Sequence, residues 1–373
     1  MRIVMRNGMY AVSLLLVSIY FALPSFVPND TGAFRFGAEY LRETRLDGLK
    51  EAIASGAYDT APQNIKDANT RQLELLEITQ GNDVAASLRA QEEISRIDLE
   101  LYDAGNLSGD YGMLKVNHAF LEQLSGLQTP SLYETTADEP MLYRLAELFG
   151  TVPPLLLFVP VVVISFAVFR SIEDDRLGFQ FPLSRKMKIS LSVVTTLIVA
   201  SLSFIVSLIP AALTSCLMNG FGDPSYPVVL MQSGEVVTLT VLSALARACG
   251  LLLMETLFVA SLSAAFFAVT SSSVPGALTC LALGFVPSIP QYFSETFILH
   301  EVLKYLPTTY FYVAPVGGWP CYLNLMDVFP VPGASWELGM TVLFACTVVF
   351  VLLSSFWCSL HLSFEPWKGA RND

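Results

Sequence analysis

The stretch VPPLLLFVPVVVISFAVF, residues 152–169, contains no charged side chain and decides the fold class of this chain. A helix needs about 20 consecutive apolar residues to cross the hydrocarbon core of a bilayer. Five further stretches have a similar apolar character, at residues 9–26, 189–213, 251–269, 274–290 and 338–362. The sequence therefore predicts an all-α integral membrane protein with six transmembrane helices.

The charged residues are few and segregated. Hydrophobic residues make up 53% of the chain and charged residues only 14%, against about 25% charged residues in soluble domains. Residues 28–150 hold 21 acidic and 10 basic side chains, which accounts for nearly all of the net charge of −12. This predicts an acidic soluble domain inserted between the first and second spans, and it argues against nucleic acid as a partner.

Basic residues in short loops indicate the orientation, because they concentrate on the cytoplasmic side of a membrane. Lys304 and Arg247 fall on the opposite predicted side. Six spans with both termini in the cytoplasm satisfy this pattern and place residues 28–150 outside. The predicted cytoplasmic side carries nine bases: Arg2, Arg6, Arg170, Arg176, Arg185, Lys186, Lys188, Lys368 and Arg371.

Three units follow along the chain. They are a first transmembrane helix at 1–27, a helical extracytoplasmic domain at 28–150 and a transmembrane domain of five helices at 151–373. In the extracytoplasmic domain the clearest helical spacing runs over 72–103, with Asn82 as a cap and Gly105 as a stop. Weaker helices are predicted at 39–55 and 113–124.

Two segments near the membrane leave alternatives open. Residues 234–247 fit either a short interfacial helix or an extension of the following span. Residues 291–336 are rich in aromatic residues and proline. Such a stretch is expected to dip into the outer leaflet or to lie along it.

Sequence motifs of catalysis are missing. His118, His300 and His361 are scattered, and none forms a metal-ligand pair at helical spacing. The sequence has neither a Gly-x-Ser-x-Gly elbow nor a phosphate-binding Gly-x4-Gly-Lys-Ser/Thr loop. We therefore expect no enzyme activity and no cofactor bound by this chain.

Glu255 is the acidic residue that lies well within a predicted span, in the sequence LLLMETLFV at 251–259. A carboxylate there costs several kcal/mol unless it is protonated, paired or facing water. One interpretation is a polar group on a substrate or proton path. The others are a hydrogen bond to a neighbouring helix, or a position nearer the interface.

The loop at 170–188, RSIEDDRLGFQFPLSRKMK, is acidic at its start and basic at its end. Pro182 restricts its backbone, and Phe179, Phe181 and Leu183 give it an apolar side. It is either a docking surface or a positive-inside anchor, and physical reasoning alone does not choose between them.

This loop resembles the cytoplasmic coupling segment of type-2 ABC exporter permeases. In that family an acidic and Gly-containing stretch after the second span leads to a Leu-Pro-x-Ser-Arg-like motif, which Glu173, Gly178, Pro182, Ser184 and Arg185 match here. The layout of one span, a large outer domain and five further spans is similar as well. Ser192 departs from the Lys that the family often has after the motif.

The resemblance implies a transport subunit in a bacterial cell membrane. Two copies of the chain, or this chain and a second permease, would form the substrate path in the lipid bilayer. Separate cytoplasmic ABC ATPase subunits would bind the coupling loop and carry ATP and Mg²⁺. Two other functions stay open from the residues: a membrane sensor with an extracytoplasmic ligand-binding domain, and a secondary carrier that uses Glu255 as a proton site.

Overall fold

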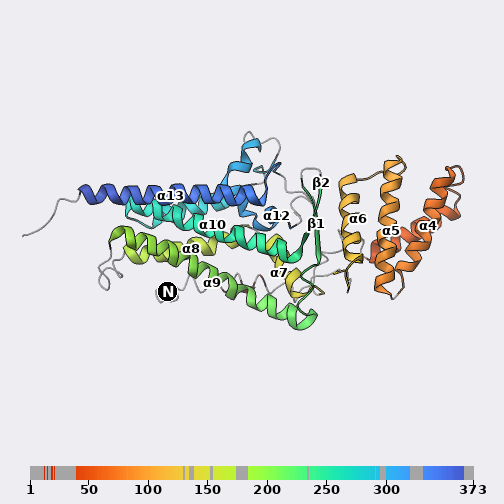
Figure 1. Ribbon diagram of the computed structural model, residues 1–373, viewed down its shortest axis with the longest axis horizontal. Coiled ribbons are helices and arrows are strands. Elements are labelled where there is room, and N and C mark those ends of the chain that lie inside the picture. Colours follow the sequence, from red (N-terminus) through yellow and green to blue (C-terminus); the bar gives the residue numbers. More distant parts are fainter. Residues whose placement is uncertain are drawn as a thin grey trace, which may run out of the picture.

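The computed structural model is elongated, with long helices along its axis and a group of shorter helices at one end (Figure 1). We call that group, α3–α6, the helical head. The structure describes residues 12, 15, 18, 19, 21, 39–81, 83–128, 131–133, 138–151, 154–173, 184–232, 235–289, 291–294, 300–319 and 331–364.

Four of the described helices are long and apolar enough to cross a membrane. All four correspond to predicted spans, and each extends beyond the apolar stretch that predicted it. Their bounds are α8 Pro154–Glu173, α9 Arg185–Asn219, α10 Val241–Thr270 and α13 Trp336–Phe364. The predicted first span, 9–26, lies largely outside the described residues.

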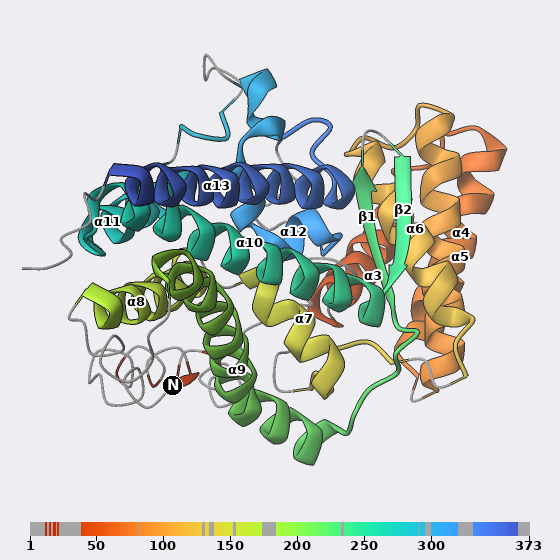
Figure 2. The same cartoon turned by 60° about the vertical axis from the view of Figure 1, so that its left-hand side comes forward.

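Helix α10 is the centre of the bundle. It packs against α13, α9, α11 and α8, and it lies between α13 and α9 in Figure 2. Its buried face includes small residues such as Ala260, Ser261 and Ala264, all at most 1% exposed. Small side chains let helices approach closely in lipid, which explains how one helix contacts four neighbours.

The predicted fifth span is not one of the long helices. Helix α11, Val274–Phe285, has 12 residues and ends in the 3₁₀ turn η2, Val286–Ser288. At about 1.5 Å per residue it is shorter than a bilayer core. Pro287 lacks the amide hydrogen needed to extend the α-helix.

Three short helices follow α11 in the part of the chain that the structure describes. They pack against α10, α11 and α13, and most of residues 308–319 is buried. The segment predicted at 291–336 thus enters the bundle where it is described. The helices are η3 His300–Tyr305, η4 Pro307–Phe311 and α12 Val313–Gly317.

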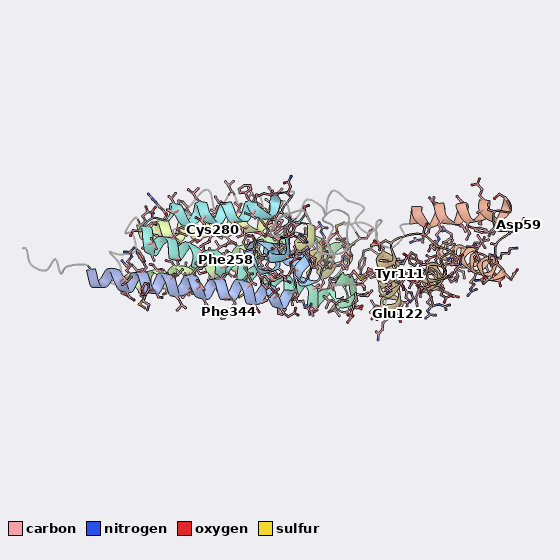
Figure 3. The ribbon with its side chains drawn as sticks, turned by 90° about the horizontal axis from the view of Figure 1, so that it is seen from above. Asp59, Tyr111, Glu122, Phe258, Cys280 and Phe344 are labelled. Atoms are coloured by element: carbon pink, nitrogen blue, oxygen red, sulfur yellow. The ribbon has the colours of Figure 1, made fainter. Side chains whose placement is uncertain are left out.

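The helical head contains the helices expected from the sequence. The region 72–103 divides into two helices, and Asp83 rather than Asn82 caps the second, by accepting hydrogen bonds from the amides of Ala85 and Ala86. Figure 3 shows Asp59 at the tip of the head, far from the spans. The bounds are α3 Glu39–Ala54, α4 Gln63–Thr79, α5 Val84–Asp103 and α6 Tyr111–Ser125.

A β-hairpin packs between the head and the bundle. Its presence corrects one prediction. Strand β1, Pro227–Gln232, pairs antiparallel with β2, Glu235–Thr240, where a helix was expected at 234–247. Four of the six residues of β2 are valine or threonine, which favour strands. The remainder of that segment, from Val241, extends α10 as the alternative interpretation predicted. The hairpin packs against α6 on one side and α10 on the other.

Candidate functional site

The two ends of the predicted coupling loop are fastened to the turn between α10 and α11. At the end of α8, Glu173 Oε2 accepts hydrogen bonds from the backbone N (3.1 Å) and Oγ (2.8 Å) of Ser273. Its other oxygen accepts from Arg170 Nη1 at 2.8 Å. The carboxylate therefore ties α8 to residues 100 positions further along the chain.

The start of α9 is fastened to the same turn. Arg185 Nη2 donates to the carbonyl of Ala268 at 3.1 Å and to Ser271 Oγ at 2.7 Å. Ser271 ends α10 in the left-handed conformation, with φ +57°, and this turn directs the chain into α11. Ser184 caps α9 by accepting a hydrogen bond from the amide of Met187 at 3.3 Å.

We call the set Glu173, Arg185, Ser271 and Ser273 the loop-end junction. Below it, the spans share a small apolar cluster that includes Phe169, Phe267 and Cys358. The junction thus joins the ends of α8, α9, α10 and α11 above a common packed layer.

Of the five predicted coupling residues, the structure brings two into the junction. Glu173 and Arg185 both contact the α10–α11 turn, and Ser184 acts locally as a helix cap. Gly178 and Pro182 lie outside the described residues. Ser271 and Ser273 were missed as partners, since their contacts span more than 80 residues and only a serine-rich turn marks them in the sequence.

Glu255 lies inside the bundle with no exposed surface. Neither of its carboxylate oxygens has a hydrogen-bond partner among the described residues. Phe258, one turn further along α10, contacts rings on η4 and α13 and is seen in the bundle interior in Figure 3. The position is therefore buried inside the bundle, near the middle of α10.

A second buried charge cluster lies at the head end of the bundle and was not predicted. Arg144, on α7 (Met141–Thr151), places Nη1 at 2.6 Å from Glu147 and at 3.2 Å from Glu139. All three side chains are 1–2% exposed. Burial, and next the negative charge of Glu147, raise the pKa of Glu139 well above its ordinary value.

This cluster is held against the end of α9. The side-chain amide of Asn219 donates to the carbonyl of Glu139 at 3.0 Å, and the amides of Met141 and Leu142 donate to the carbonyls of Gly220 and Phe221. Two acids around one arginine carry a net charge of −1 unless one acid is protonated. The raised pKa of Glu139 is consistent with such a proton. The spacing of Glu139, Arg144 and Glu147 is a sequence signal for this cluster. An exposed helix with surface ion pairs can have the same spacing, so the signal does not distinguish the two.

The residues that the structure describes include no group of three or more His, Cys, Asp or Glu side chains placed to hold a metal ion. The long apolar helices around the loop-end junction indicate a helical membrane protein. Comparison of the chain with family models, curated proteins and solved structures found no match.

Proposed function

We propose that this chain is the membrane-spanning permease subunit of an ATP-driven exporter, of the type-2 ABC class that its sequence resembles. It works as a homodimer or beside a second permease, and the loop at 170–188 docks on a separate cytoplasmic ATPase. The observation that carries the proposal is the loop-end junction. A connector between two spans has no need of four hydrogen bonds that tie its ends to the end of α10 and the start of α11.

The junction supplies a mechanical route for coupling. When ATP binding draws two ATPase subunits together, the loop is displaced with the subunit that holds it. Glu173 passes that displacement from α8 to Ser273 at the start of α11, and Arg185 passes it from α9 to the end of α10. The spans then move as a group, because packed helices shift between discrete arrangements rather than deform.

The proposal is tested by purifying this chain from its native membrane and asking whether an ABC ATPase is retained with it. Phe181→Asp introduces a charge at an apolar position of the loop sequence and should abolish retention of the ATPase. Phe221→Asp is the matched control, since Phe221 is 54% exposed and belongs to the opposite end of the bundle. Both variants are first checked for membrane insertion. Failure of the wild-type chain to retain any ATPase, or equal retention by Phe181→Asp, would contradict the proposal.

One observation favours a second candidate, a proton-coupled secondary carrier. The carboxyl of Glu255 has no partner among the described residues, and such groups mark proton relays in membrane proteins. Proteoliposomes that contain this chain without an ATPase separate the two functions. Exchange driven by a pH gradient alone, and lost in Glu255→Gln, favours the carrier. Transport that requires the ATPase and ATP favours the exporter.

A further inference from the structure

A second unpartnered polar group lies level with Glu255. The rings of Phe258 on α10 and Phe350 on α13 contact each other, with centroids 5.8 Å apart. Glu255 and Thr347 each precede their ring by three residues, and the two helices run in the same direction, so both groups lie one turn nearer the head (Figure 1). Thr347 is 4% exposed, and its hydroxyl also lacks a hydrogen-bond partner among the described residues.

The countercharge for Glu255 is not supplied by the described part of the chain. The described arginines of the spans lie near their ends: Arg170 and Arg185 at the loop end, and Arg247 eight residues before Glu255, about 12 Å along the helix. A carboxylate in apolar surroundings must gain a proton or a cation. When a bound cation dissociates, the carboxylate is left free to bind another cation.

One helical turn from Glu255, the ring of Phe258 belongs to an aromatic group. The ring of Phe311 lies 6.1 Å from that of Phe258 and 4.6 Å from that of Phe158, between centroids. Phe350 completes the group from α13. Aromatic faces attract cations and also bury apolar surface. A carboxylate beside such rings is suited to a cation with an apolar body rather than to a hydrated metal ion.

We propose that Glu255 and Thr347 bind a lipophilic organic cation of the ammonium or phosphonium type between α10 and α13. This names the substrate class of the proposed exporter and rests on that proposal. Both side chains are buried in this structure, so a cation reaches them only when the helices move. Only 28% of the most apolar stretch of α13 is buried inside the protein, against 67% of the corresponding stretch of α10. Because α13 is the less buried of the two helices, we expect that it is the one that moves outward to admit a cation dissolved in the bilayer.

The test measures equilibrium binding of tetraphenylphosphonium to the purified full chain in lipid nanodiscs, without an ATPase. Saturable binding is expected in the wild type, with no comparable binding of the uncharged triphenylphosphine oxide. Glu255→Gln should weaken tetraphenylphosphonium binding about thirtyfold or more, as expected for loss of one partner of a buried charge pair. Thr347→Val should weaken it less. Glu337→Gln and Thr341→Val, both at exposed positions of α13, are the matched controls and should bind like the wild type.

The wild-type protein provides a second readout that requires no substitution. Protons compete with the cation for one carboxylate, so acidification should weaken tetraphenylphosphonium binding, and Glu255→Gln should remove that dependence. Absence of saturable binding, equal binding by Glu255→Gln, or preference for the uncharged probe would overturn the cation site. Because the assay contains no ATPase, those results leave the exporter proposal to its own co-purification test.

Discussion

Ser273 shows how one residue joins α8 to the start of α11. Its hydroxyl and its amide both donate to the same oxygen of Glu173, and a half-buried carboxylate that accepts such bonds is well satisfied. The neighbouring Ser272 has no comparable role, since its hydroxyl accepts only a 3.4 Å bond from the amide of Val274. Two adjacent serines in one turn therefore differ sharply in what they contribute.

Ser273→Ala should lower the stability of the purified chain by about 1 kcal/mol, because it removes one hydrogen bond to a charged group. Thermal unfolding in detergent measures the effect, with Ser272→Ala as the control. If the exporter proposal holds, Ser273→Ala also lowers transport per ATP hydrolysed while the ATPase stays bound. Equal effects of the two substitutions would show that the junction does not depend on Ser273.

Glu139 makes stability depend on pH. Its pKa is raised in the folded chain by burial first and by the charge of Glu147 second. A raised pKa means that the stabilising contribution is complete below the ordinary carboxyl pKa and is lost as the pH rises through the folded value. The chain should therefore lose stability as the pH rises from the ordinary carboxyl pKa to the raised pKa of Glu139, by at most about 1.4 kcal/mol per pH unit for release of one proton.

Glu139→Gln should flatten that pH dependence, because the side chain no longer titrates. The measurement is the midpoint of thermal unfolding over a series of pH values. Glu122→Gln is the control, since Glu122 is an exposed carboxyl on α6 (Figure 3). A wild-type profile that Glu139→Gln leaves unchanged would show that another group titrates there.

At the scale of elements, the short helices near the head depend on close approach to glycine. Gly150 of α7 faces Trp319, and a Cβ added there would lie 2.3 Å from Trp319 Cδ1. Trp319 is 2% exposed and also contacts the ring of Tyr143 at 5.2 Å. The indole therefore cannot move aside without disturbing a packed aromatic group.

Gly150→Ala should destabilise the chain by about 1–3 kcal/mol, the usual cost of overfilling a packed core. Gly48→Ala is the matched control in α3, where an added Cβ meets nothing within 4 Å. That substitution should stabilise by about 0.5–1 kcal/mol through helix propensity. Opposite shifts of the unfolding midpoint are the expected result, and a neutral Gly150→Ala would mean that Trp319 is not fixed.

Elements that depend on local composition could be predicted from the sequence, and elements that depend on distant partners could not. The four long helices follow from uninterrupted apolar stretches. The hairpin was missed although two strand-prone segments flank residues 233–234, a spacing typical of a two-residue turn. The fifth span was overestimated because apolar composition does not reveal that α11 stops after 12 residues. Partners such as Ser271 and Ser273 need the packed bundle to meet Arg185 and Glu173.

The whole molecule has two unlike ends. The helical head belongs to the block of 21 acids and 10 bases, and its α3–α5 core is separate from the main core of the bundle. Helix α5 joins them, because its Ile94 belongs to the head core and its Leu88 belongs to the main core. At the other end, Arg185, Lys186 and Lys188 occupy the first turn of α9. Basic side chains are unfavourable at a helix N-terminus, because the helix dipole is positive there. Their presence therefore needs an explanation other than helix stability.

The positive-inside rule explains these basic residues, and it predicts that this end of the molecule faces the cytoplasm and the head faces the other side of the membrane. In a variant without native cysteines, Asp59→Cys marks the tip of the head and Lys186→Cys marks the loop end, both at exposed positions. A membrane-impermeant maleimide added to spheroplasts should label Asp59→Cys directly and Lys186→Cys only after the membrane is permeabilised. Both ends cannot be reached from one side if the four long helices span the bilayer between them. Labelling of both cysteines without permeabilisation would overturn the transmembrane arrangement, and a reversed pattern would place the head inside and exclude docking of the loop on a cytoplasmic ATPase.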